Sequence, residues 1–206
     1  PATVIAIIIG VPPEDIDQIK AWSDDLATFV GSALETPDKR DLAENSVRAM
    51  TAYFKDIIAH RRKHPPEEFT IIDNLIAAEE HGAVLDEATL VASCILLLFA
   101  GHETTTNLFG NGLLAMLRNP DQLAALRNDA NMTNSAVEEF LRYDGPIGAM
   151  PRVTVEPYKV GNVTLPPGER VFCMVNAANR DPSIFRDPDR LNLKRPANRH
   201  IVFGYG

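Results

Sequence analysis

The longest continuous pattern in the sequence is an apolar stretch over residues 90–117, which is typical of a helix buried on most of its faces. Its first part, residues 90–100, contains Ser93 as its one polar side chain. So short a run cannot span a bilayer, which needs about 20 apolar residues. The pattern therefore predicts a core helix, and Asp86 is placed to cap its start. We expect this helix to cover residues 87–118.

Amphipathic spacing predicts helices on both sides of this stretch, because apolar side chains recur every three or four residues. Asn119 and Pro120 are typical of a helix start, with Asn119 as the cap and proline in the first turn. Ser135 and Glu138 have the spacing of a capping box, which predicts that the next helix begins there. The expected helices cover residues 1–10, 13–30, 41–63, 67–78, 120–128 and 136–143.

The pattern changes after Pro146, where short apolar runs alternate with proline and glycine turn signals. Residues 152–156, 158–160, 163–165 and 170–175 read as strands of a small antiparallel meander. Residues 176–200 show no periodicity, and so long an irregular segment in a compact domain is often functional. We expect a mainly α single domain over residues 1–206, with a helical part over residues 1–145 and the β meander within residues 146–206.

Composition narrows the function classes. The chain has 206 residues, 45% of them hydrophobic, and a net charge of −8, with a short basic cluster at residues 60–64 that is more typical of a helix C-terminus than of nucleic-acid binding. Cys94 and Cys173 lie in apolar surroundings without metal-like spacing, which is typical of core thiols in a reducing compartment. We find no nucleophile elbow, phosphate loop or dinucleotide fingerprint, so hydrolase and kinase functions have no support.

Candidate chemistry lies in the middle of the central helix, where residues 101–106 break the helical rules. Gly101 removes a side chain, so a flat and bulky group could lie against the backbone. Thr104 can donate to the carbonyl of Ala100, which bends a helix and opens a groove. Glu103 and Thr104 place an acid beside a hydroxyl, as a proton relay requires. A kinked core helix with a hydrated polar pocket explains the same residues equally well.

Three further features each have a functional and an ordinary interpretation. Glu139 and Arg142 share one helix face and can form a bidentate ion pair, or an exposed pair worth a few tenths of a kcal/mol. Arg152 follows an apolar loop and can hold an anionic group of a ligand, or lie at a strand edge. The terminal residues 203–206, Phe-Gly-Tyr-Gly, can bring the backbone close to a ligand, or form an aromatic turn.

In this order, the features resemble the bacterial cytochrome P-450 family of haem-thiolate monooxygenases. The family's acid–alcohol helix motif matches residues 100–104, Ala-Gly-His-Glu-Thr, and its Glu-x-x-Arg helix matches residues 139–142. Its propionate-binding arginine matches Arg152, and the turns at residues 179–182 and 187–190 match its meander. Residues 203–206 match the start of its haem-ligand loop. The resemblance covers essentially the whole chain.

The resemblance implies a cofactor, haem b (iron protoporphyrin IX), and roles for the matching residues. Glu103 and Thr104 would be catalytic, delivering protons through water, and Glu139 and Arg142 would be structural. The expected haem-binding residues are Ala100, Gly101, Arg152, Phe203, Gly204 and Gly206. The expected substrate-pocket residues are Leu97, Leu98, Ile147, Gly148, Ala149 and Met150.

The chain departs from the family at its ends. It stops four residues before the position of the thiolate cysteine, and neither Cys94 nor Cys173 matches that ligand. The N-terminal half of the family's fold and its terminal helix have no counterpart. We therefore expect a family fold truncated at both ends, an internal fragment whose iron ligand lies beyond Gly206.

For the parent protein, the resemblance implies a cytoplasmic monomer that inserts one oxygen atom of O2 into an apolar small organic substrate. Electrons would come from a ferredoxin- or flavodoxin-type partner, and no membrane or nucleic acid would be bound. One alternative is a peroxygenase; in the family such members carry Arg-Pro where this chain has Glu103 and Thr104, which argues against it. The other is a haem-free helical scaffold or binding protein that retains remnants of the fold.

Overall fold

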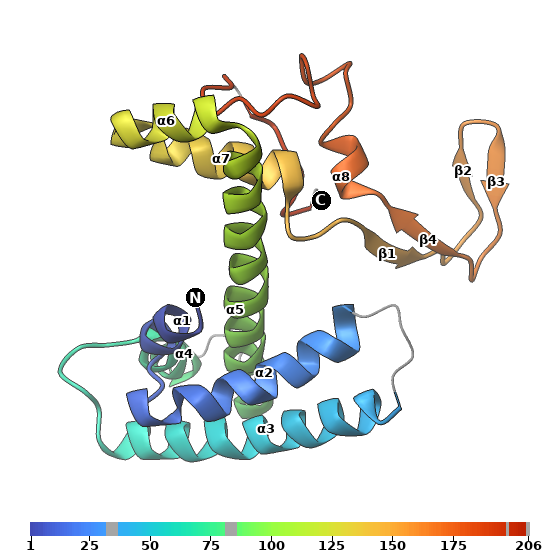
Figure 1. The fold of residues 1–206 in the computed structure, drawn as a ribbon. Coiled ribbons are helices and arrows are strands. Elements are labelled where there is room, and N and C mark those ends of the chain that lie inside the picture. Colours follow the sequence, from blue (N-terminus) through green and yellow to red (C-terminus); the bar gives the residue numbers. More distant parts are fainter. Residues whose placement is uncertain (32–36, 81–85, 197, 205–206) are drawn as a thin grey trace. The chain divides into compact units, whose positions relative to one another are not determined.

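The amphipathic stretches of the sequence form helices in the computed structural model of the chain (Figure 1). The structure describes residues 1–31, 37–80, 86–196 and 198–204. Two compact units are present, Pro1–Thr106 and Asn107–Gly206, and the boundary between them falls within the central helix. Each unit is described by itself below.

The first unit is helical and is built around one apolar core. Its helices are α1 (Ala2–Ile9), α2 (Ile16–Gly31), α3 (Lys39–Lys63), α4 (Ile71–Glu80) and the first part of α5 (Glu87–Arg118), and a short 3-10 turn (Pro13–Asp15) precedes α2. The core takes side chains from all five helices, among them Ala6, Ile9, Ile19, Met50, Phe54, Ile58, Ile72, Leu90, Cys94 and Leu98. The apolar stripes predicted from the sequence are therefore the surfaces that pack together.

The starts and ends of these helices follow from local hydrogen bonds. Gly10 ends α1 in the left-handed conformation, with φ of 107°. The predicted start of α4 at residue 67 is wrong by four positions. Thr70 closes a capping arrangement with Asp73, whose Oδ2 accepts from the Thr70 amide at 2.8 Å and from the Thr70 hydroxyl at 2.6 Å, so the helix begins at Ile71.

The central helix α5 covers the predicted residues. Asp86 caps it, because its Oδ1 accepts from the Thr89 amide at 2.8 Å. The α-helix continues without interruption through Gly101 and Thr104. By length and composition alone α5 is apolar enough to cross a membrane. Leu90, Cys94 and Leu98 on one of its faces nevertheless belong to the core of the first unit, as expected for an interior helix of a folded domain.

The second unit contains the rest of α5 with α6 (Pro120–Asn128), α7 (Thr133–Asp144), α8 (Val175–Ala178), a 3-10 turn (Ala130–Met132) and four strands. One cap prediction is right in position only, and another is wrong. Asn119 is the N-cap residue of α6 and Pro120 opens that helix, but the Asn119 side chain donates backwards to the Ala115 carbonyl at 2.9 Å. Ser135 lies inside α7, because the 3-10 turn leads directly into that helix at Thr133.

The strands are antiparallel but are not paired as a meander. β1 (Met150–Val153) pairs with β4 (Arg170–Cys173), and β2 (Tyr158–Val160) pairs with β3 (Val163–Leu165), so one hairpin is nested inside the other pairing. The reason is Thr154, which exchanges backbone hydrogen bonds with Glu169 and Gly168 and donates its hydroxyl to Pro166. These bonds fix the segment between β3 and β4 beside β1.

Candidate active site

The acid–alcohol pair lies on α5 in the first unit. The Thr104 hydroxyl donates to the Ala100 carbonyl at 2.7 Å, which confirms the predicted hydrogen bond. The Thr106 hydroxyl makes the equivalent bond to the His102 carbonyl at 2.9 Å. A hydroxyl bonded in this way keeps its oxygen lone pairs free, so Thr104 can still accept a hydrogen bond from water.

Glu103 points along a different direction from Thr104, because neighbouring residues on a helix do not share a face. Its carboxylate oxygen lies 4.0 Å from Nδ1 of His102, and its side chain is 27% exposed. Among the described residues, no hydrogen bond joins the Glu103 and Thr104 side chains. A proton passing between them therefore requires intervening water, as expected for a relay.

The missing side chain of Gly101 serves helix packing in this structure. A Cβ at Gly101 would lie 2.6 Å from Cγ1 of Ile5, so α1 approaches α5 closely at this glycine. Ala100, the preceding residue, is exposed. Of the two small residues, Ala100 is the one that presents an open surface.

One predicted pocket residue on α5 is misplaced. Leu97 is 37% exposed and is free to line a pocket, whereas Leu98 is 1% exposed and packs in the core of the first unit. The prediction for Leu98 was wrong because the apolar run gives no signal for which of two adjacent leucines faces the core.

In the second unit, the predicted anion-binding arginine lies on β1, opposite Val171. Arg152 is exposed, and its guanidinium makes one hydrogen bond among the described residues, from Nη1 to the neighbouring Pro151 carbonyl at 2.9 Å. Most donors of the guanidinium therefore remain available for a carboxylate.

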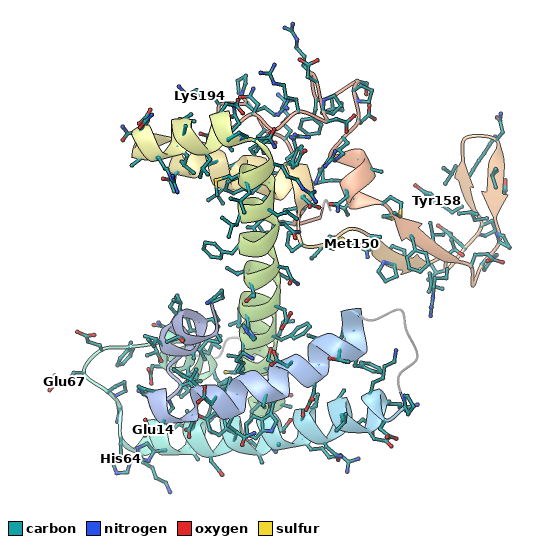
Figure 2. All side chains as sticks on the ribbon, in the orientation of Figure 1. Glu14, His64, Glu67, Met150, Tyr158 and Lys194 are labelled. Carbon is teal, nitrogen blue, oxygen red and sulfur yellow. The ribbon has the colours of Figure 1, made fainter. Side chains whose placement is uncertain are left out.

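The apolar loop and the terminal turn lie close to this strand. Met150 (labelled in Figure 2) begins β1, and its Cε would lie 3.9 Å from a Cβ placed on Gly204. The Gly148 carbonyl accepts from the Asn176 amide at 3.1 Å, which ties the loop to α8. Ile147 and Ala149 are half-buried.

The terminal turn has two features suited to a ligand loop. Gly204 has φ of 87°, a conformation that favours glycine, and Phe203 is 83% exposed. Gly206 lies outside the described residues.

The Glu139–Arg142 pair is fully buried on α7, and its bidentate geometry is as predicted. Nε of Arg142 donates to Oε2 of Glu139 at 2.8 Å, and Nη2 donates to Oε1 at 2.9 Å. Neither side chain has any exposure, so the exposed-pair interpretation is wrong. Buried charges of this kind must be paired and fully hydrogen-bonded to be tolerated.

The pair organises the irregular segment that follows α8. Arg142 also donates to the carbonyls of Asn179 at 3.0 Å and Pro188 at 2.8 Å. Glu139 also accepts from the Asn192 amide at 2.9 Å and from Nε of Arg195 at 3.0 Å. Residues 179–195 therefore keep a fixed path without regular secondary structure, because their backbone groups bond to these two side chains.

Arg195 and His200 are members of this region that sequence reasoning did not place. Arg195 joins Glu139 and also donates to the Arg190 carbonyl at 3.1 Å. His200 binds Glu138 of α7 at 2.9 Å, and its ring lies 5.9 Å from the ring of Phe203. His200 thus anchors the terminal turn to α7. An arginine or histidine in an aperiodic segment carries no pattern that would have indicated these contacts.

Cys94 is not suited to serve as a thiolate ligand. Cys94 is fully buried in the core of the first unit, and burial raises the pKa of its thiol to about 11, so it stays protonated at neutral pH. The core-thiol prediction is wrong for Cys173, which is the exposed last residue of β4 and pairs with Met150.

Comparison with known proteins decides the family. The sequence profile of the family described as cytochrome P-450 matches residues 30–204. The chain belongs to the cytochrome P-450 family. It is 40% identical over 205 residues to the "Biotin biosynthesis cytochrome P-450" of Bacillus subtilis (strain 168), covering 98% of this chain and 50% of that protein. It is 42% identical to "Cytochrome P-450 107B1" of Saccharopolyspora erythraea, covering all of this chain and 49% of that protein.

The fold agrees with the sequence comparison. The crystal structure of the BioI cytochrome P-450 in complex with an acyl carrier protein ligated to hexadec-9Z-enoic acid matches with a TM-score of 0.90 and 39% identity. That match covers 100% of this chain and 52% of that one. The predicted P-450 fold is therefore confirmed, and the chain spans about half the length of the P-450 proteins it matches.

The described residues fit haem, the cofactor of this family, in part. Arg152 offers a guanidinium with free donors to a propionate carboxylate. Phe203 presents an uncovered aromatic ring beside the positive-φ Gly204. Cys94 does not fit an iron ligand, because it is a buried neutral thiol.

Proposed function

We propose that the full-length protein containing this chain is a haem-dependent monooxygenase. The observation that carries this proposal is the Glu103–Thr104 pair on α5, with the Thr104 hydroxyl donated to the Ala100 carbonyl, in a chain of the P-450 family. An acid and a hydroxyl in this arrangement are suited to proton delivery, which oxygen activation requires.

Candidate haem b residues lie in each of the two units. In the second unit, Arg152 would bind a propionate, and Phe203, Gly204 and Gly206 would begin the ligand loop. In the first unit, Ala100 would face the ring. Gly101 would act beside it mainly by admitting Ile5. When bound, a haem with a thiolate ligand supplies an iron that activates dioxygen. The ligand cysteine would lie outside this chain.

The protein's own residues would handle the protons. Glu103 is partly exposed and can exchange protons with water, while Thr104 holds a water molecule by accepting its hydrogen bond. Because the two side chains point in different directions, we infer that each binds a different water molecule in a hydrogen-bonded row of waters. The peroxygenase alternative has no support from this pair.

The substrate class is an apolar small organic molecule. The candidate lining residues of each unit are apolar: Leu97 on α5 in the first unit, and Ile147, Ala149 and Met150 with Gly148 in the second. The acyl chain carried by the BioI complex is a ligand of this kind. We propose a cytoplasmic monomer that receives electrons from a ferredoxin- or flavodoxin-type protein.

The test is substitution of Thr104 by Ala in the full-length protein, with Thr106→Ala as the matched control. Thr106 makes the same kind of backbone hydrogen bond two residues later, so both variants lose one such bond. We expect Thr104→Ala to consume oxygen and reductant with little product, while Thr106→Ala keeps the product-to-oxygen ratio of the parent. Equal ratios in the two variants would refute the relay assignment.

A further inference from the structure

A cluster of titratable side chains that includes Glu103 lies between α2 and α5 of the first unit. Asp24 on α2 and His102 and Glu103 on α5 each place one ligand atom within 4.8 Å of the others. The three residues come from two helices that share the core of this unit, so the cluster is a feature of tertiary packing.

His102 is the most informative member, because it is buried and its hydrogen bond to Ser23 is long. The residue is 5% exposed. Its Nδ1 lies 3.3 Å from the hydroxyl of Ser23 and 4.0 Å from the Glu103 carboxylate, and both distances are long for a strong hydrogen bond. A long hydrogen bond of this kind is weak, so a metal ion could replace it at low cost.

The ligand types suit a transition-metal ion. Imidazole nitrogen and carboxylate oxygen bind Zn2+ at about 2.0–2.2 Å, and three protein ligands with water in the fourth position are a common set. The three ligand atoms lie within 4.8 Å of one another, so side-chain rotation would have to draw them around the ion. The Ser23 hydroxyl contacts the same Nδ1 that faces Glu103, so a metal ion on this nitrogen would replace that long hydrogen bond.

One cation already competes for the site. Nζ of Lys20 lies 2.8 Å from Oδ2 of Asp24, and the Lys20 side chain is 51% exposed. Lys20 can therefore swing into solvent when a divalent ion arrives. With Lys20 counted, the two carboxylates leave the cluster with a net charge of −1, which still favours a cation.

We propose that Asp24, His102 and Glu103 bind a divalent transition-metal ion of the zinc type and thereby link α2 to α5. The bound ion would occupy the Glu103 carboxylate. If the proposed monooxygenase function is correct, zinc would also slow product formation, because Glu103 could no longer exchange protons with water.

The experiment is a zinc titration of the full-length haem-loaded protein, followed by isothermal calorimetry and by the thermal unfolding midpoint. We expect the parent protein to bind zinc at one site. His102→Gln and Asp24→Asn should each lower the zinc affinity of this site at least about tenfold, since even an outer-shell change causes a loss of that size. Asp24 is half-buried rather than core, so this second variant keeps the test valid if His102→Gln fails to fold.

The matched control is His60→Gln. His60 stacks on His64, with ring centroids 4.7 Å apart, at the end of α3 (His64 is labelled in Figure 2), so this pair is the natural place for adventitious zinc. Zinc binding that is lost in His60→Gln and retained in the cluster variants would overturn the proposal, as would equal binding in all variants. Calorimetry needs no turnover, so its outcome stands apart from the outcome of the oxygenase test.

Discussion

Replacing Gly101 by Ala tests why a glycine stands in the middle of α5. The new Cβ would lie 2.6 Å from Cγ1 and 2.8 Å from Cδ1 of Ile5. Carbon atoms pack best at about 3.5–4.0 Å, so Ile5 or α1 must shift by close to 1 Å. Ile5 packs against the core of the first unit, which limits how far it can move.

Two effects of opposite sign decide the magnitude. Alanine is favoured over glycine in a helix interior by roughly 1 kcal/mol. Overpacking a filled site costs about 1–3 kcal/mol. We therefore expect Gly101→Ala to lower the free energy of unfolding by about 1 kcal/mol. In an Ile5→Ala background the clash is absent, and the same change should be stabilising, which corresponds to a coupling of about 2 kcal/mol.

The assay is urea unfolding of the full-length protein, monitored in parallel by circular dichroism and by haem absorbance. Gly110→Ala is the matched control, because Gly110 lies in the same helix and a Cβ there meets nothing within 4 Å. The control should be stabilised by up to about 1 kcal/mol. The packing explanation fails if Gly101→Ala is as stable as the parent, loses haem, and is not stabilised in the Ile5→Ala background. Glycine would then be required at this position to make room for haem, not for Ile5.

Three further outcomes follow from the structure. Arg142→Ala should destabilise the protein by about 3–5 kcal/mol in urea unfolding, because it leaves the buried Glu139 carboxylate with fewer donors. The control Arg186→Ala, whose side chain is 96% exposed, should change stability by less than about 0.5 kcal/mol. Similar losses in the two variants would contradict a stabilising role for the Glu139–Arg142 pair. The unfolded chain releases the Cys94 proton near its ordinary pKa of 9.0, whereas the folded chain holds it until a pKa of about 11. The free energy of unfolding should therefore fall by up to about 3 kcal/mol as pH rises from 9 to 11. A Cys94→Ala variant that loses the same stability over this pH range would contradict the assignment to Cys94. The isolated chain should aggregate in size-exclusion chromatography, because Leu96, Phe109 and Leu117 of α5 are 64%, 70% and 62% exposed; a monomer with a cooperative unfolding transition would contradict this.

The helices could be predicted because their signals are local. An apolar period of 3.6 residues, a capping Asp86 and a helix-opening Pro120 each act within a turn or two of the chain. Errors arose where two local interpretations competed. Asn119 can cap either of the helices that meet there, and the structure shows that it bonds backwards to Ala115.

The strand pairing and the buried network could not be predicted, because both depend on contacts between distant segments. Thr154 looks like any strand threonine, yet its bonds to residues 166–169 decide which strands pair. Arg195 lies 56 positions from Glu139 in the sequence, and nothing near it indicates a partner.

The candidate site could be predicted only in part. The Thr104–Ala100 hydrogen bond follows from helix geometry, and the i,i+3 spacing of Glu139 and Arg142 predicted their ion pair. The complete burial of that pair could not be read from the spacing. The roles of Leu98 and Gly101 depended on which helix packs against each face of α5, and a continuous apolar run does not carry that information.

The most direct test of the proposed function is the haem content of the full-length protein after purification from cells supplied with iron. We predict a single haem per polypeptide with the absorbance of a thiolate-ligated iron, and weaker haem retention in Arg152→Ala, whose guanidinium has free donors in this structure. A stably folded monomer that purifies without haem would contradict the proposal and favour the haem-free scaffold.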